Sequence, residues 1–136
     1  MPSAYFSGVR VKEISEEACT VSIPYKWFSR NPFRSTYFAC LAMAAEMSTG
    51  ALAMACLYKK KPAVSMLVLN IRGEYFKKAT GTTLFTCSMG EAFRNCVNRA
   101  IETGEAQALE AVSEGRDTEG NIIANFTITW SFKARV

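Results

Sequence analysis

Alternating apolar and polar positions predict strands near both ends of the chain. In residues 20–23 and 125–132 apolar side chains alternate with polar ones, as in strands with one buried face. A continuous apolar run at 64–71 is typical of a central strand, and we expect it to bend through 72–74. In chain order the predicted strands are residues 9–14, 18–25, 64–71, 82–89, 107–116 and the segment after the turn at 117–121.

A long helix is predicted between the second and third strands. Residues 35–58 are apolar almost all round, and Glu46 is the only charged residue among them, so this helix should be buried. The pair Asn31–Pro32 has the residue types of an N-cap and a first helical position, and Ser35 or Thr36 offers a second cap a turn later. An ionised carboxylate in a buried helix is costly unless it is paired or takes part in chemistry, which makes Glu46 the first candidate for function.

A second, shorter helix completes the predicted set of elements. Residues 91–103 place apolar side chains at helical spacing and end at Gly104. The resulting order is two strands, the long helix, two strands, the short helix and two strands. This order predicts an α+β fold in which a curved antiparallel sheet wraps around one long central helix. The length of 136 residues fits one domain, spanning residues 1–136.

Composition and charge narrow the range of partners. The chain is 49% hydrophobic and 21% charged, with a formal net charge of +4, which is ordinary for a globular protein. The positive charge slightly favours an anionic partner such as a phosphorylated small molecule. Because the lysines and arginines are dispersed and no nucleic-acid-reading motif accompanies them, we expect no nucleic acid partner.

The absence of histidine excludes several chemistries. Zinc sites built on imidazole, Ser-His-Asp triads and Cys-His dyads all need a residue that this chain lacks. The five cysteines are odd in number and have no metal-binding spacing, which predicts reduced thiols and no metal site. The N-terminus has neither the basic start nor the apolar stretch of a secretory signal, so we predict a cytoplasmic protein.

The long apolar segment could also be read as a membrane span. Residues 35–58 are long enough to cross a bilayer, and Lys59–Lys61 follow them as a stop-transfer signal would. However, Glu46 lies at the centre with Ser48–Gly50 beside it, and alanine dominates over leucine, isoleucine and valine. A buried helix explains these features better, and we predict no membrane span.

The order of elements resembles the hotdog fold. Residues 31–46 look like the start of the central helix in a thioesterase-like hotdog family of unknown function, related to the phenylacetate-pathway acyl-CoA thioesterases. Residues 81–84, Gly-Thr-Thr-Leu, are similar to the family's Gly-Asp-x-Leu segment. The resemblance implies hydrolysis of acyl-CoA or another acyl thioester without a cofactor. It also implies a homodimer or dimer of dimers with a shared pocket, and the long apolar strands argue for pairing independently.

The catalytic motif of the better-known hotdog thioesterases has no direct counterpart here. In them a His-Gly-Gly turn opens the helix, and an acidic residue follows nine residues after the histidine. Arg34, Ser35 and Thr36 stand just before the apolar run of this chain, and nine residues after Arg34 is Met43. The sequence therefore predicts that Glu46 is displaced by one helical turn from the usual position, or that the loop before the helix is built differently.

The resemblance implies a set of roles around Glu46. Backbone N–H groups at the helix start would polarise the thioester carbonyl, and Glu46 would act as general base on water or as a nucleophile. The alternative is a structural carboxylate paired with Arg30, Arg34 or a tyrosine. The predicted catalytic residues are Glu46, with Asn31 or Thr49 to orient the water, and the predicted amide donors are those of Ser35, Thr36 and Tyr37.

Further substrate-binding candidates are basic or out of place in their surroundings. Arg72, Lys77, Lys78 and Arg99 could hold the phosphates of coenzyme A, or form a solvated basic surface. Arg34 is a further substrate-binding candidate. Asn70, inside an apolar strand, is either a site residue or a satisfied core amide. A second hypothesis for the whole protein is a non-catalytic hotdog domain that binds an acyl chain or acyl-CoA as carrier or regulator.

Overall fold

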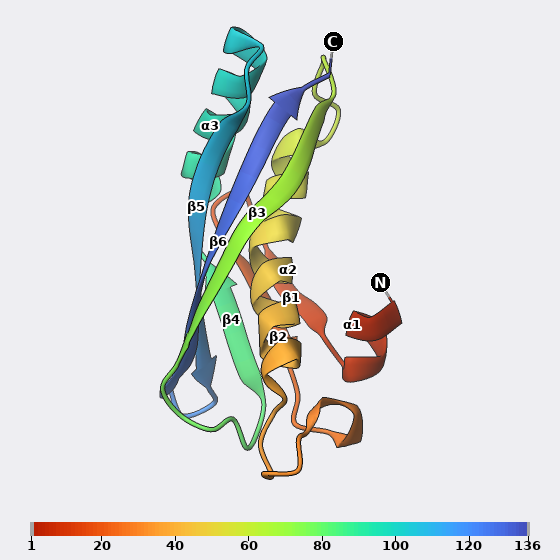
Figure 1. Ribbon diagram of the computed structural model, residues 1–136, viewed down its shortest axis with the longest axis vertical. Helices are drawn as coiled ribbons and strands as arrows, with labels where there is room; N and C mark the ends of the chain where they lie inside the picture. Colours follow the sequence, from red (N-terminus) through yellow and green to blue (C-terminus); the bar gives the residue numbers. More distant parts are fainter. Residues whose placement is uncertain (1, 136) are drawn as a thin grey trace.

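The long apolar segment forms one helix, α2 (Phe38–Leu57), around which a curved sheet wraps in the computed structural model, which describes residues 2–135 (Figure 1). Within those residues six strands form a single antiparallel sheet in the order β1-β2-β4-β5-β6-β3. This architecture confirms the predicted α+β hotdog fold. The remaining elements are α1 (Pro2–Ser7), β1 (Arg10–Ile14), β2 (Cys19–Ile23), the 3₁₀ turn η1 (Trp27–Ser29), β3 (Val64–Tyr75), β4 (Thr83–Cys87), α3 (Gly90–Thr103), β5 (Gln107–Asp117) and β6 (Ile122–Ala134).

The predicted start of the central helix is wrong. The helix begins at Phe38 with Tyr37 as its N-cap residue, and no side chain caps it. Asn31, one of the expected caps, instead closes a turn, because its Oδ1 accepts hydrogen bonds from the N–H groups of Phe33 (2.9 Å) and Ser35 (3.2 Å). Such a turn satisfies the backbone locally and competes with helix formation, so the helix starts only after it.

The face of α2 that meets the sheet carries polar contacts as well as apolar packing. The hydroxyls of Ser48 and Ser113 on β5 lie 2.6 Å apart, and the indole N–H of Trp130 on β6 donates to Thr49 Oγ1 at 2.9 Å. By length and composition α2 qualifies as a candidate membrane span, but half of its apolar window is buried inside the protein. These contacts are those of a core helix.

The short helix α1 was not predicted, although it positions part of the site. It lies beside α2 (Figure 1), and the Cys40 thiol of α2 lies 3.8 Å from the Ser7 hydroxyl. Six residues are too few to show helical periodicity. The five cysteines are all free thiols in the structure.

Candidate functional site

The Glu46 carboxylate is half-buried and has no partner. Within residues 2–135 no ion pair or hydrogen bond reaches its oxygens, so the structure does not contain the predicted alternative pairing with Arg30, Arg34 or a tyrosine. Burial raises the pKa of the Glu46 carboxyl above the ordinary glutamate value of 4.5, since desolvation disfavours the charged form. An unpaired carboxylate with a raised pKa is suited to accept a proton.

Gly50 lies one turn after Glu46 and borders its carboxylate. A Cβ on Gly50 would lie 3.4 Å from Glu46 Oε1 and 3.3 Å from a ring carbon of Trp130. Gly50 is therefore a common neighbour of the carboxylate and of the indole, whose N–H donates to Thr49 Oγ1.

Glu46 opens into an apolar groove between α1 and α2. The groove has a volume of about 550 Å³. Ser3 is the other polar residue in a lining formed by Pro2, Ser3, Ala4, Phe38, Ala39, Ala42, Met43 and Glu46. A ligand in this groove would meet hydrocarbon on most sides and a single ionisable group.

The predicted amide donors at the helix start are occupied. The N–H of Ser35 donates to Asn31 Oδ1 (3.2 Å), that of Thr36 to the carbonyl of Ala79 (2.8 Å) and that of Tyr37 to the carbonyl of Ser29 (2.6 Å). The prediction that these three amides face a ligand is therefore wrong.

The N–H groups of Phe38 and Ala39, the first two residues of α2, are free of such partners among the described residues. No acceptor is found for the N–H of Phe38 or Ala39 in the described part of the chain, as is usual for the first amides of a helix. Both residues also line the groove that contains Glu46. Sequence reasoning missed them because a backbone donor is identified by the exact start of the helix, which was placed too early.

The later helix start also changes the spacing to the carboxylate. Counted from the N-cap Tyr37, Glu46 is the ninth residue. The hotdog thioesterase motif has the same spacing between its histidine and its acidic residue, whereas the count from Arg34 ended at Met43. The comparison with that motif therefore depends on which residue is taken to open the helix.

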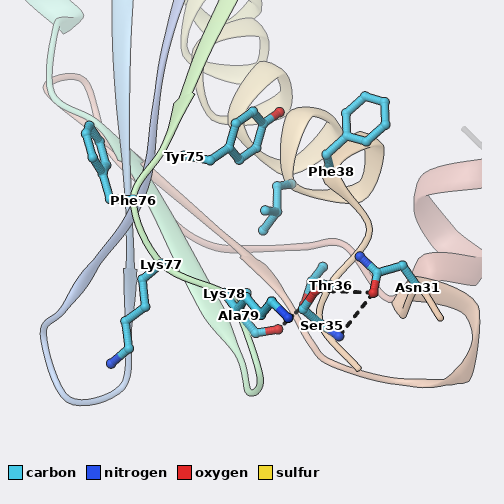
Figure 2. Close-up of a pocket in the computed structure, with 10 residues that line it drawn as sticks. Asn31, Ser35, Thr36, Phe38, Tyr75, Phe76, Lys77, Lys78 and Ala79 are labelled. Atoms are coloured by element: carbon cyan, nitrogen blue, oxygen red, sulfur yellow. Dashed lines mark hydrogen bonds between the residues drawn. The ribbon is translucent and has the colours of Figure 1, made fainter. Parts of the chain in front are cut away.

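A second cavity brings together five of the predicted residues. It has a volume of about 360 Å³ and lies at the start of α2, where Asn31, Ser35, Thr36, Lys77 and Lys78 line it together with Phe38, Leu41, Tyr75, Phe76 and Ala79 (Figure 2). Phe38 lines both this cavity and the Glu46 groove. The predicted residues are thus divided between two neighbouring spaces.

The lysines of this second cavity differ in their contacts. Lys77 Nζ lies 3.8 Å from a carboxylate oxygen of Asp117, and Figure 2 shows its side chain pointing away from Asn31 and Ser35. Within residues 2–135 no hydrogen bond or ion pair is found for the Lys78 ammonium. Lys78 is therefore the better placed of the two to meet an anionic ligand.

Asn70 and Arg72 are not part of either cavity. The side chain of Trp130 on β6 faces α2, and Val68 of β3 pairs with Trp130 in the sheet. After Val68 the register of β3 against β6 shifts by one residue, at a bulge between Val68 and Asn70. Asn70 and Arg72 then pair with residues of β6 that face away from the helix. Without this bulge both side chains would point toward α2.

Three further predicted residues have other surroundings. Thr49 is buried, and its hydroxyl donates to the Glu46 carbonyl (2.9 Å) while accepting from Trp130, so it packs the helix against the sheet. Tyr37 is exposed at the helix start, and Arg34 is exposed with a positive φ of 61°. Neither lines the two cavities described above.

Comparison with solved structures defines the class of this fold. A protein of unknown function from Pseudomonas aeruginosa, described as a probable thioesterase, superposes with a TM-score of 0.88 at 18% identity, covering 99% of this chain and 89% of its own. A protein of unknown function from Chlorobaculum tepidum gives 0.84 at 13% identity, covering 99% and 88%. A thioesterase from Haemophilus influenzae gives 0.67 at 11% identity, covering 97% and 82%. These likenesses show that the protein has the hotdog fold.

The family follows from the sequence itself. The model of the domain of unknown function DUF4442 matches residues 2–132, and the chain belongs to this family. Comparison with curated proteins finds no match.

Proposed function

We propose that this protein hydrolyses acyl thioesters, with acyl-CoA as the substrate and Glu46 as the catalytic carboxylate. The observation that carries the proposal is the unpaired, half-buried carboxylate in an otherwise apolar groove. The structurally similar proteins described as thioesterases support the same reaction. In this reaction water adds to the thioester carbonyl, the carbon–sulfur bond breaks, and a carboxylic acid and the free thiol leave.

The start of α2 supplies the groups that stabilise the reaction's charge in this proposal. The amides of Phe38 and Ala39, with the positive end of the helix dipole, hydrogen-bond the thioester oxygen as it becomes negative. Glu46 is eight positions after Phe38 in α2, which corresponds to about 12 Å of helix rise. Because helical side chains lean toward the N-terminus, a thioester carbonyl and one water molecule fill the remaining distance.

This distance favours Glu46 as general base over Glu46 as nucleophile. The carboxylate removes a proton from the water while the oxygen attacks the carbonyl carbon, and the proton is later available to the departing thiolate. A direct attack to form an anhydride would require the carbonyl to lie against the carboxylate, further from the amide donors.

The second cavity is the proposed site for the anionic part of the substrate. Lys78 is free to meet a phosphate, and the Ser35 and Thr36 side chains add polar groups beside it. Asn31 holds the turn that carries these residues rather than the water proposed from the sequence. Phe38 lies between the two spaces and would contact the substrate where it passes from one to the other.

We also propose a homodimer formed through β3. This edge strand has twelve residues, and Leu67, Leu69 and Ile71 expose 64%, 57% and 47% of their surface. The opposite edge, β1, has only five residues, with Arg10, Lys12 and Glu13 among them. Since a long apolar edge is protected in stable proteins, β3 is the edge that needs a partner.

The dimer is tested by placing a charge on either edge. Light scattering should give a dimeric mass for the wild type and for Val11→Lys on β1, and a monomeric mass for Leu69→Lys on β3. A dimeric mass for Leu69→Lys, or a monomeric wild type, would contradict pairing through β3.

The reaction is tested with a panel of short, medium, long and aromatic acyl-CoAs. The purified wild type should hydrolyse at least one of them, Glu46→Ala should not, and Glu102→Gln, which changes an exposed glutamate of α3, should match the wild type. No turnover of any substrate by the wild type, or equal turnover by Glu46→Ala, would remove the catalytic proposal.

The non-catalytic alternative keeps support from one observation. The His-Gly-Gly turn of the better-known hotdog thioesterases is absent from this chain, which has no histidine. A protein that only carries or senses acyl-CoA would bind the panel members in calorimetry without releasing thiol, and Glu46→Ala would then alter affinity alone.

A further inference from the structure

We propose that the aromatic patch formed by Tyr5, Phe6, Trp27 and Phe28 binds the surface of an anionic lipid membrane. Tyr5 and Phe6 belong to α1, and Trp27 and Phe28 belong to η1. Between 62% and 70% of each side chain is exposed. Large aromatic side chains at this exposure, gathered in one place, are characteristic of an interaction site rather than of an ordinary surface.

The four rings form a continuous chain. The ring centroids of Tyr5 and Phe6 are 5.6 Å apart, those of Phe6 and Phe28 are 6.3 Å apart, and those of Trp27 and Phe28 are 4.7 Å apart. The contact between Phe6 and Phe28 joins α1 to η1, although the two elements are separated in the sequence. The patch is therefore a defined surface on two neighbouring elements.

Within segment 2–37 the charged residues next to the patch are cations. The Arg10 guanidinium lies 4.6 Å from the centre of the Tyr5 ring, Lys26 and Arg30 flank η1 in the sequence, and Arg34 follows in the next turn. The acidic residues of segment 2–37 are Glu13, Glu16 and Glu17. Glu13 lies near the C-terminal end of β1, and Glu16 and Glu17 follow the strand. Glu17 forms an ion pair with Arg94 of α3.

Aromatic rings surrounded by cations match the chemistry of an anionic bilayer surface. Trp and Tyr favour the boundary between headgroups and acyl chains, Phe enters the apolar side, and Lys and Arg are attracted to anionic headgroups. Pairing of this patch with the same patch of a second copy would bring two sets of cations together, because a two-fold interface is self-complementary. Charge therefore favours lipid over another copy of the chain.

The position of the patch would also suit an acyl substrate. Figure 1 shows α1 beside α2, and Pro2, Ser3 and Ala4 of α1 form one wall of the Glu46 groove. Membrane contact through this patch places the groove next to the bilayer. The binding proposal itself does not depend on the proposed thioesterase activity.

The test is sedimentation of the full chain with lipid vesicles. Vesicles of equal parts phosphatidylcholine and phosphatidylglycerol should bind the wild type, pure phosphatidylcholine vesicles should bind it weakly, and added salt should release it. The double variant Trp27→Ala, Phe28→Ala should bind about ten-fold more weakly. Tyr58→Ala is the matched control, since Tyr58 is 75% exposed and precedes Lys59 at the other end of α2.

Each other outcome would overturn the proposal. Failure of the wild type to bind at low salt, equal binding to both vesicles, or a loss of binding in Tyr58→Ala but not in the double variant would remove this patch as the lipid site. A change in molecular mass of the double variant by light scattering would identify the patch as an interface between copies. Selective binding to an acidic protein without binding to vesicles would assign it to a protein partner.

Discussion

Glu46 and its neighbours Ser48 and Thr49 are polar residues within one turn of the same helix, but their surroundings differ. Both hydroxyl groups are fully buried and hydrogen-bonded, Ser48 to Ser113 and to the Ala45 carbonyl, and Thr49 to Trp130 and to the Glu46 carbonyl. The Glu46 carboxylate is half-buried and has no such partner among residues 2–135. Among the described residues the two hydroxyl groups therefore have hydrogen-bond partners, and the carboxylate has none.

In the proposed mechanism this difference separates a structural role from a functional one. Satisfied buried hydroxyls fix how α2 lies on the sheet and stabilise the fold. A partly desolvated carboxylate without a partner lowers stability, and a protein retains it at the cost of that stability when the group is needed. Substitutions at the two kinds of position should therefore affect different measurements.

The largest expected effect is the loss of activity in Glu46→Gln. Removal of a general base costs about 10²- to 10⁴-fold in rate, and kcat/KM for the best acyl-CoA of the panel should fall within that range while the thermal midpoint does not fall. Because the base must be ionised and its pKa is raised, wild-type activity should decline with falling pH at values above 4.5. The residual activity of Glu46→Gln should lack this decline.

Thr49→Val should lower the stability of the fold while the proposed catalytic carboxylate, Glu46, stays in place. The change leaves the buried indole N–H of Trp130 without its acceptor, which costs about 1–3 kcal/mol of the free energy of unfolding. Urea unfolding measures the loss, and Thr118→Val, an exposed threonine in the turn before β6, is the control. If Thr49→Val were as stable as the control but inactive, Thr49 would have the direct role in orienting water that the sequence suggested.

A smaller effect is expected from the hydroxyl pair between Ser48 and Ser113. Either alanine substitution removes the buried hydrogen bond between the two hydroxyls, and Ser48→Ala also removes the bond to the Ala45 carbonyl. The free energy of unfolding should fall by about 1 kcal/mol for each bond that is lost. The double variant should lose less than the sum of the two single losses, because each single change also leaves one hydroxyl without its partner. Strict additivity in urea unfolding would show that the two hydroxyls are not coupled.

The strength and the limits of the sequence analysis come from different kinds of interaction. The strands, the two longer helices and Glu46 were found because apolar periodicity and an isolated charge can be recognised within a short stretch of sequence. The start of α2 was missed because Asn31 satisfies a local turn instead of capping the helix. The placement of Asn70 and Arg72 depends on one bulge, which reverses the face of every residue after it.

The candidate site shows the same limit. Glu46 was identified from its sequence neighbours, whereas the free amides of Phe38 and Ala39 depend on backbone hydrogen bonds that carry no residue signature. The groove required α1, which is too short to be recognised from periodicity. Long-range contacts and exact element boundaries therefore decided which of the predicted residues meet.

The smallest expected effect, and the most specific to the comparison, is a pH-dependent gain of stability in Glu46→Gln. The pKa of Glu46 is higher in the folded protein than in the unfolded chain, so the folded state holds this proton more tightly. The ionised carboxylate therefore destabilises the fold. This loss of stability is absent well below pH 4.5 and grows as the pH rises from 4.5 to the raised pKa of the folded state. It is complete at pH values above that raised pKa. Solvent reaches the groove and screens the charge, so the gain at neutral pH should stay below about 1 kcal/mol. Urea unfolding of both proteins across this pH range measures the difference; a variant that is less stable than the wild type at neutral pH and equal to it at low pH would mean that the Glu46 carboxylate has a stabilising partner in the assembled protein.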